Sequence, residues 1–384
     1  MSDAMASMLA VCASTPQGGS QLFLDIVGSA GSGKTTMCDG LLVSRTCHHL
    51  EHLSGVGFHS GFKMTGEKSD KDCSLIARIN GKTLVTSEAD VMISSPHYKE
   101  WMSQTRRIFD GKSGKTFGNS DEDTLWQGLR TPWIRAGTPV IMDTDQSRLG
   151  DRFMRYIIDE PRQDTKRDIL RAAFDSQLVS MEEESNGTQA SIENPKKRLA
   201  KELTGGYVDW LRANTSEVIR NIPVGESARE AIIDMAELTA DLRARPNRDK
   251  SKEETHETKE LPARLVEQFA KVARCLAVVT STNMVSHHVM RIVRKLALST
   301  AHGHSLSIAK WIGECCHPGT KRLHQETGVG VGQLAMWASM TEERMLAYCL
   351  FLRKVGVLER VPNRSELWRL TDRTFQLYRR VCCG

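Results

Sequence analysis

Residues 28–35 match the pattern G-x-x-x-x-G-K-[ST], whose residue types and spacing suit the binding of phosphate groups. Backbone N–H groups of such a loop can surround a phosphate. The pattern assigns Lys34 to the β- and γ-phosphates and the Thr35 hydroxyl to Mg²⁺. The other residues predicted to contact the nucleotide are Gly28, Ser29, Ala30, Gly31, Ser32, Gly33 and Thr36. The sequence therefore predicts a nucleoside triphosphate site, with ATP and Mg²⁺ as the expected cofactors.

The segments on either side of this loop have the patterns that the motif requires. Residues 22–27 form a short apolar run typical of a buried strand, and residues 35–38 can begin a helix. A strand, a glycine-rich loop and a helix in this order place the loop at the positive end of the helix dipole. We therefore expect an α/β fold in which a parallel central sheet carries the loop.

A second apolar run ends in acidic residues. The run up to Thr86 is followed by Ser87-Glu88-Ala89-Asp90. An NTPase with this phosphate loop needs such acids, one for the Mg²⁺ water shell and one to polarise the attacking water. Glu88 is the candidate for polarising water, and Asp90 is a candidate for the metal site or a cap for the next helix. Both acids can also be read as loop or cap residues without a catalytic role.

Two later positions complete the candidate catalytic set. Residues 132–139 predict a central strand that ends near Thr138, where a polar group would lie beside the γ-phosphate. Arg152 precedes a further predicted strand at 156–159. An arginine there can reach the nucleotide of a neighbouring subunit and neutralise charge in the transition state.

Local signals predict the elements between these motifs. Asn80-Gly81 is a strong hairpin signal, and it lies between runs at 73–79 and 82–86. Ser95-Pro96 predicts the start of a helix that continues to Phe109.

A glycine-rich segment at 112–120 carries Lys112, Lys115 and Phe117. On a hairpin, the two lysines could bind nucleic-acid phosphates while the ring stacks on a base. A solvated surface hairpin is an equally good interpretation of these residues.

The order of these motifs resembles the AAA+ ATPases, specifically the MCM-like replicative helicases of cells, phages and mobile elements. Over residues 20–300 the chain is also similar to phage- and plasmid-borne ATPases that carry a primase-like region upstream. In that family the acidic strand reads F-I-D-E-x-D and the arginine motif S-R-F-D. Glu88 and Asp90 match the last two acids, and Ser87 stands where the family has the metal-shell Asp. Arg152-Phe153 matches the arginine motif, with Met154 in place of Asp, and Thr138 replaces the usual Asn.

The resemblance implies more than the single motifs do. It implies a P-loop AAA+ core with an α-helical lid, assembled as a homo-oligomer, with the hexamer as the family's usual form. ATP would be hydrolysed at subunit interfaces, and single-stranded DNA would pass through the central pore. A primase or an origin-binding protein is the partner that the resemblance suggests.

A strong amphipathic helix follows Pro262. Its apolar residues recur at helical spacing, namely Leu265, Phe269, Val272, Leu276 and Val279. Arg264 in its first turn matches the second sensor of AAA+ lids, which contacts the γ-phosphate; it can also be an ordinary solvated arginine. A second lid helix is expected at 287–298, and the earlier helices between 199 and 235 should bury Trp210 and Leu211.

The C-terminal residues predict a winged helix. Helices are expected at 306–315, 331–339 and 341–354, followed by paired strands at 357–361 and 367–370. The cations predicted to hold nucleic acid here are Arg353, Lys354 and Arg364. A winged helix can equally contact a protein partner.

Length and composition limit the remaining choices. The 384 residues carry a net charge of only +5, so composition alone does not demand a nucleic-acid partner. Ten cysteines without C-x-x-C spacing favour reduced thiols in a cytoplasmic protein, and no run is long enough to cross a membrane. The expected organisation is a flexible tail at 1–20, an ATPase core at 21–160, a helical lid region at 161–300 with an exposed charged loop at 243–260, and a winged-helix domain at 301–384.

The function expected from the sequence is an ATP-dependent nucleic-acid motor, a ring-shaped DNA helicase or translocase acting in replication. A non-translocating AAA+ switch, such as a loader or regulator, is the alternative, and the replacement of an acid by Ser87 favours it. A small-molecule kinase shares the phosphate loop, but it does not account for the lid arginine or the winged helix.

Overall fold

The computed structural model describes residues 3–53, 57–59, 74–115, 124–142, 152–160, 195–243, 261–315 and 328–383, with parts of 163–174. Its centre is a five-stranded sheet in which every neighbouring pair is parallel. In spatial order the strands are β2 (Cys47–His49), β3 (Thr83–Thr86), β6 (Trp133–Gly137), β1 (Phe23–Val27) and β7 (Phe153–Ile157). The expected α/β architecture with a parallel central sheet is confirmed.

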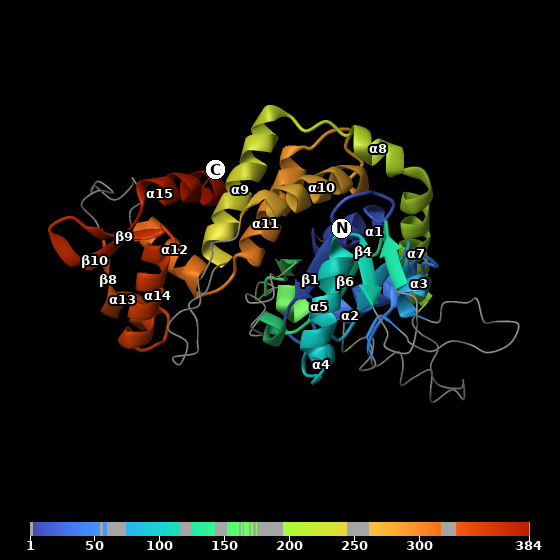
Figure 1. Ribbon diagram of the computed structural model, residues 1–384, viewed down its shortest axis with the longest axis horizontal. Helices are drawn as coiled ribbons and strands as arrows, with labels where there is room; N and C mark the ends of the chain where they lie inside the picture. The colour runs from blue at the N-terminus through green and yellow to red at the C-terminus, as the bar shows by residue number, and fades with distance from the viewer. Residues whose placement is uncertain are drawn as a thin grey trace, which may run out of the picture.

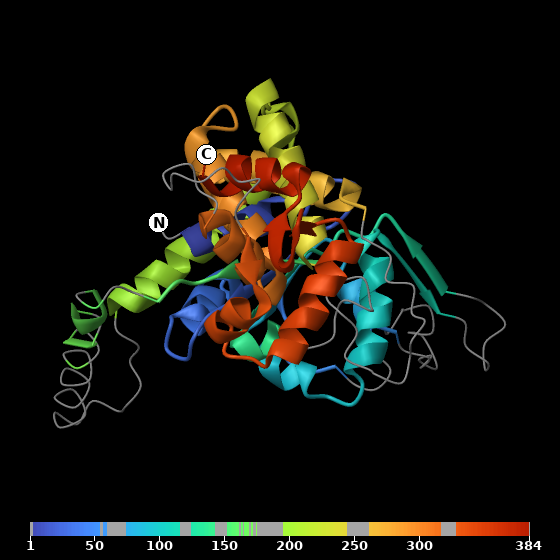
Figure 2. The same ribbon diagram turned by 90° about the vertical axis from the view of Figure 1, so that its left-hand side faces the viewer.

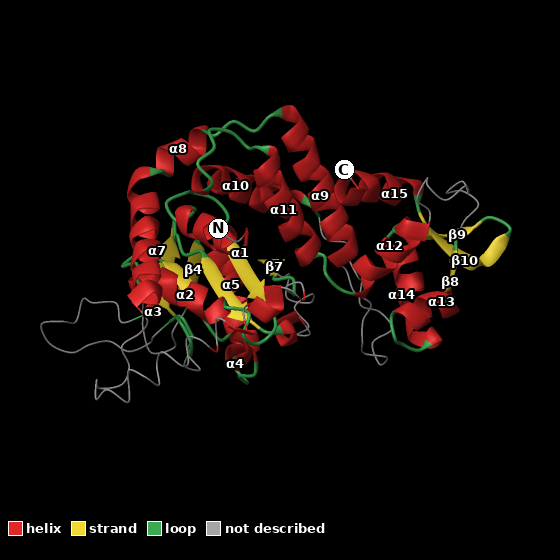
Figure 3. Ribbon diagram, turned by 180° about the vertical axis from the view of Figure 1, so that it is seen from behind, coloured by secondary structure: helices red, strands yellow, loops and turns green. Residues whose placement is uncertain are grey.

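Helices cover both faces of this sheet, as Figure 3 shows. Phe23, Trp133 and Phe153 face one core, where they pack with side chains of α3 (Leu75–Ile79) and α5 (Tyr98–Phe109). Alternate residues of the same strands face a second core formed with α1 (Asp3–Ala13), α2 (Lys34–Leu42), α7 (Pro195–Asn214) and α10 (Ala263–Val279). Burial on both faces explains why the strands read as continuous apolar runs.

A buried ion pair lies in the middle of the sheet. The Arg135 guanidinium on β6 donates two hydrogen bonds to the Asp25 carboxylate on β1, at 2.8 and 3.0 Å. Both side chains are fully buried, and the guanidinium also lies 3.5 Å from the ring centre of Phe153. Its remaining nitrogen donates to the hydroxyl of Tyr98 at 3.2 Å. The pair therefore joins the two central strands by side chains as well as by the backbone ladder.

The N-terminal residues are not the flexible tail that the sequence predicted. They form α1, in which most side chains are buried, and this helix packs along α10. Small and apolar residues such as Ala10 and Val11 let α1 cover the apolar face of α10 closely. The segment is part of the main core.

The predicted hairpin around Asn80-Gly81 is also wrong. Gly81 does adopt a left-handed turn, with φ of +77°, but the residues before it form helix α3 and only those after it form strand β3. Ile76 and Ile79 are spaced for one face of a helix, and both are buried there. Tertiary burial of that face outweighed the local turn signal.

Several predicted elements are confirmed close to their expected bounds. Helix α5 begins two residues after Pro96 and ends at Phe109. The apolar residues predicted to line α10 are all buried, and α11 (His287–Thr300) follows it. The preceding helices are α7, α8 (Ser216–Asn221) and α9 (Glu226–Arg243), seen with α10 and α11 in the upper part of Figure 1.

Trp210 on α7 differs from the expectation of a buried side chain. Its side chain is 53 % exposed and stacks on Tyr207, whereas the neighbouring Leu211 is buried as predicted. Successive helical residues point about 100° apart, and on α7 it is Leu211 that faces the core while Trp210 faces outward.

Helix α11 closes one edge of the sheet. The backbone N–H of Arg155 on β7 donates to the Thr300 hydroxyl at 2.9 Å, and that of Ile157 donates to the Ser299 hydroxyl at 3.2 Å. At the carboxyl end of the strand, Lys295 pairs with Asp159 at 2.5 Å. The helical region at 195–300 thus packs directly on the sheet.

The C-terminal residues form a smaller unit at one end of the molecule (Figure 1). It contains α12 (His304–Cys315), α13 (Val331–Trp337), α14 (Glu342–Lys354), the antiparallel sheet of β8 (Val329–Gly330), β10 (Arg364–Leu370) and β9 (Leu358–Val361), α15 (Asp372–Tyr378) and a last turn at 379–383. Thr341 caps α14 by accepting from the N–H of Arg344, as predicted. Arg373 and Arg380 join this unit to acids of α9.

A two-stranded hairpin of β4 (Lys112–Lys115) and β5 (Thr124–Gln127) projects from the main body in Figure 2. Its tip, which includes Phe117, lies outside the described residues. The charged segment 244–260 lies outside them as well. Within the described part of the chain, none of the helices has the length and apolar character needed to cross a membrane.

Candidate nucleotide site

The phosphate loop lies at the carboxyl end of β1, between this strand and α2. Gly31 and Gly33 have φ of +76° and +81°, a conformation that favours glycine, and Gly33 immediately precedes the first turn of α2. Ligands of open parallel sheets bind at this edge, outside the carboxyl ends of the strands. The loop therefore presents its N–H groups where an anion is expected.

Lys34 is folded back into the loop. Its ammonium donates to the carbonyl oxygens of Gly28 and Ser29, both at 2.8 Å, and to the Ser32 hydroxyl at 3.2 Å. Burial lowers the pKa of Lys34, while the nearby Asp90 carboxylate acts in the opposite direction. A cation so placed can exchange these carbonyl acceptors for phosphate oxygens.

Asp90 and Thr138 form a direct contact between neighbouring strand ends. The backbone N–H and the hydroxyl of Thr138, just beyond β6, donate to the Asp90 carboxylate at 3.0 to 3.2 Å. Asp90 lies in the first turn of α4 (Ala89–Ile93), which has no side-chain cap. The structure thus brings together the predicted sensor and the second acid of the acidic strand.

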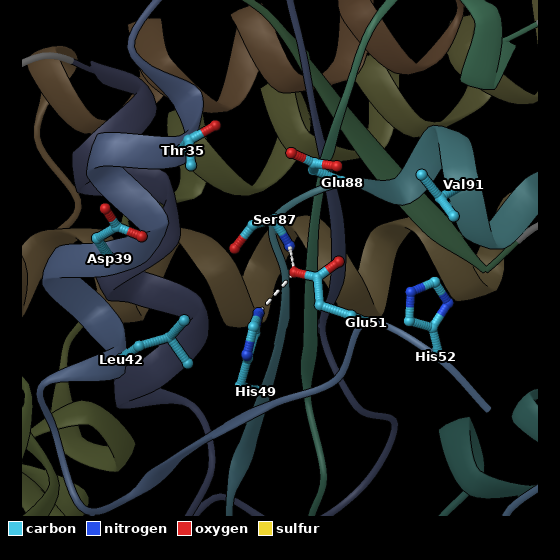
Figure 4. A pocket seen from close by; sticks show the side chains of 9 residues that line it. All are labelled: Thr35, Asp39, Leu42, His49, Glu51, His52, Ser87, Glu88 and Val91. Carbon is cyan, nitrogen blue, oxygen red and sulfur yellow. Dashed lines mark hydrogen bonds and ion pairs between the residues drawn. The ribbon is translucent and has the colours of Figure 1, made fainter.

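A cavity of about 350 Å³ opens beside the loop (Figure 4). Thr35 from α2 and Glu88 from the end of β3 both line it, and both are exposed residues. The other lining residues are Asp39, Leu42, His49, Glu51, His52, Ser87 and Val91. The sequence motifs predicted that Thr35 and Glu88 belong to the nucleotide site, and in the structure both line this cavity.

The oxygen donors of this cavity fit Mg²⁺. A hydroxyl and carboxylates are the ligands that this ion prefers, and with a nucleotide it needs only one or two from the protein, since phosphates and water supply the rest. The described residues contain no group of three or more His, Cys, Asp or Glu side chains arranged as an all-protein metal site. Thr35 and the carboxylates would hold the ion only together with phosphate.

Glu51 and His49 line the cavity although no sequence motif predicted them. The Glu51 carboxylate accepts from the N–H of Ser87 at 2.9 Å and lies 2.6 Å from Nε2 of His49. His49 ends β2, whose three residues, Cys47–His49, lack an apolar pattern, and Glu51 follows two residues later. The only signal in the sequence is an acid shortly after a possible strand, and histidines in such a segment are typical of packing or surface positions.

Arg152 and Arg264 lie away from the loop, near the amino ends of the strands. Arg152 directly precedes β7, and its guanidinium lies 5.4 Å from the ring centre of Phe109. Gln268 on α10 donates to the Arg152 carbonyl at 2.9 Å, and Arg264 lies one turn earlier on that helix. Within one chain, neither predicted arginine reaches the phosphate loop, because the arginines lie near the amino ends of the strands and the loop lies at the carboxyl ends.

The residues predicted to bind nucleic acid are placed on three elements. Lys112 is exposed on β4, and Lys115 ends the same strand. Arg353 and Lys354 are exposed at the end of α14, and Arg364 is exposed at the start of β10. Other cations of the C-terminal unit are engaged, since Arg369 pairs with Glu359 and Arg360 stacks on Trp368.

Comparisons with known proteins add no family to this geometry. The chain matches no protein-family model, and a search of curated proteins returns no match.

Proposed function

We propose that this protein is an ATP hydrolase that works as a ring-shaped AAA+ motor on nucleic acid, with single-stranded DNA as its substrate. One observation carries the proposal. Lys34, Thr35 and Glu88 lie at the carboxyl edge of a parallel sheet, where Thr35 and Glu88 line one cavity and the Lys34 ammonium is held within the adjoining loop. This is the edge at which parallel α/β sheets bind ligands.

The chemistry follows from these side chains. Lys34 would neutralise charge on the β- and γ-phosphates, and Thr35 would hold Mg²⁺, which supplies Lewis-acid polarisation of the phosphates when it is bound. Glu88 is exposed to the cavity and would orient and deprotonate the attacking water. Asp90 holds Thr138 through three hydrogen bonds. A movement of Asp90 at the carboxyl end of β3 would therefore shift Thr138 at the end of β6.

Placement of the two distant arginines supports assembly. Arg152 and Arg264 lie near the amino ends of the strands, at the opposite end of the sheet from the chain's own loop, so a nucleotide that they contact would belong to another subunit. A hexameric ring satisfies this requirement for every subunit at once. The arrangement of α12 to α14 with the small antiparallel sheet supports a winged helix as the nucleic-acid module.

Mixed oligomers test the contribution of Arg152 to a neighbouring site. We expect Arg152→Ala to lower the rate of ATP hydrolysis by about tenfold or more, because the negative charge that develops on the phosphates in the transition state loses the guanidinium that stabilises it. A mixture of Arg152→Ala and Lys34→Ala subunits should regain activity, since some interfaces then combine both native residues. Phosphate release, with and without single-stranded DNA, measures this. Full activity of Arg152→Ala alone, or a loss of activity that no mixing ratio restores, would show that Arg152 does not act between subunits.

The exposed cations of the C-terminal unit give a separate prediction. Replacing Arg353, Lys354 and Arg364 by alanine should lower the slope of log affinity against log salt by about 0.7 for each phosphate that these side chains neutralise. Fluorescence anisotropy of a labelled single strand measures this slope. Arg229→Ala is the control, because Arg229 is exposed on α9 and is not among the residues predicted to bind nucleic acid. An unchanged slope in the triple variant would assign the C-terminal unit to protein binding.

The alternative is a switch that uses ATP to assemble without translocating. Ser87 supplies a hydroxyl where motors carry an acid, and slow hydrolysis suits a switch. A strand-displacement assay separates the two proposals, since a switch hydrolyses ATP without displacing a strand.

A further inference from the structure

Glu51 lies at the candidate nucleotide site although it belongs to none of the motifs predicted from the sequence. Its carboxylate lines the same cavity as Thr35 and Glu88, although it comes from the segment after β2 (Figure 4). Its side chain is 25 % exposed, so it is neither a free surface group nor a closed core residue.

The orientation of this carboxylate is fixed by donors on one oxygen only. Oε1 accepts from the N–H of Ser87 and contacts His49 Nε2. Within the described residues, Oε2 takes part in no hydrogen bond, and Figure 4 shows it turned away from both donors. One oxygen therefore fixes the group, and the other remains available to water or a cation.

The other carboxylates near the loop have different partners. Asp39 pairs with Lys201 of α7 at 3.0 Å, and Asp90 accepts from Thr138. Glu88 is the group placed to act on water. Ser87, at the position where a carboxylate would serve the metal, has only a hydroxyl, and the backbone N–H of that same residue holds Glu51.

We infer that Glu51 supplies the carboxylate that Ser87 lacks, and that it holds the water shell of Mg²⁺ bound with the nucleotide. The inference rests on the proposed function, because it requires a nucleotide at the loop. The charge that Ser87 does not carry is then supplied from another part of the chain, because the segment after β2, the strand beside β3, brings the Glu51 carboxylate to the cavity beside Thr35.

The test measures metal-dependent binding instead of turnover. The affinity of the full-length chain for a fluorescent, non-hydrolysable ATP analogue is recorded over a range of Mg²⁺ concentrations. Glu51→Gln keeps an oxygen for the Ser87 N–H but removes the charge, so a purely structural link between β2 and β3 would survive it. We expect this variant to need about 10- to 100-fold more Mg²⁺ for the same tightening of analogue binding.

Rescue and control variants sharpen the result. Adding Ser87→Asp to Glu51→Gln returns a carboxylate to the cavity and should restore much of the Mg²⁺ dependence. Glu226→Gln should leave it unchanged, because Glu226 is exposed on α9, where it pairs with Arg229, and does not line the cavity. Far-UV circular dichroism checks that each variant is folded.

Two outcomes overturn different statements. If the wild type binds the analogue with Mg²⁺ dependence and Glu51→Gln behaves identically, the inference about Glu51 is wrong and the nucleotide site stands. If the wild type does not bind the analogue at any Mg²⁺ concentration, the proposed function itself is wrong.

Discussion

Replacing Lys34 by alanine should lower ATP hydrolysis by about 10²- to 10³-fold, the cost typical of removing one preorganised donor from a developing negative charge. The reason lies in the geometry of the loop. Lys34 is 8 % exposed, and its ammonium is held by two carbonyl oxygens and a hydroxyl of the loop itself. A charge so confined is already where phosphate oxygens would replace those acceptors. Release of inorganic phosphate from ATP in the presence of Mg²⁺ measures the effect.

Lys201→Ala is the matched control for this experiment. Lys201 is also a lysine near the cavity, but it comes from α7 and pairs with Asp39. Its loss should change hydrolysis little, because a partly exposed ion pair of this kind contributes at most about 1 kcal/mol. If Lys34→Ala hydrolyses ATP at the wild-type rate, ATP is hydrolysed at another site, and the assignment of this loop as the nucleotide site is wrong.

Asp25→Ala should destabilise the protein by about 3–5 kcal/mol, the usual cost of leaving one member of a buried ion pair alone. Both Asp25 and Arg135 are fully buried, and the guanidinium lies between a carboxylate and the ring of Phe153. Without Asp25 the positive charge would stay in the core, where the remaining acceptors among the described residues are the Tyr98 hydroxyl and the Met102 sulfur. The change in the midpoint of urea unfolding, followed by far-UV circular dichroism, measures the loss.

Two further variants locate the cause of this destabilisation. Asp25→Leu combined with Arg135→Met removes both charges, and it should be closer to wild type than Asp25→Ala, because no buried charge is left unpaired. Glu226→Ala breaks the exposed pair with Arg229 and should cost less than about 1 kcal/mol. If Asp25→Ala and Glu226→Ala unfold at the same urea concentration, the buried pair does not stabilise the sheet.

The sequence predicted the elements whose signals are local and strong. The glycine loop, the apolar run of β1 and the helical spacing along α10 each determine their structure without help from distant residues. The positions of Lys34 and Thr35 followed from the motif alone. Glu88 and Thr138 could be placed because parallel strands end at a common edge.

The elements that were missed depend on tertiary packing. Helix α1 forms where a tail was expected because α10 offers an apolar face to cover. Strand β2 has only three residues, Cys47–His49, and its pairing with β3 supplies what its sequence does not specify. Since Glu51 follows β2, its contact with Ser87 depends on this strand pairing and could not be predicted from the sequence. The same holds for the ion pair of Asp25 and Arg135, which are 110 positions apart.

The hydroxyls of Ser299 and Thr300 have a consequence for assembly. They occupy N–H groups of β7 that another strand would otherwise use, and the opposite edge of the sheet is the short β2. Copies of this chain therefore cannot join by extending the sheet from β7, which is a common route to irreversible aggregation. Contacts between copies on that side must use helices and side chains. In the proposed ring, contacts of this kind could slide and re-form during ATP turnover without breaking a backbone ladder.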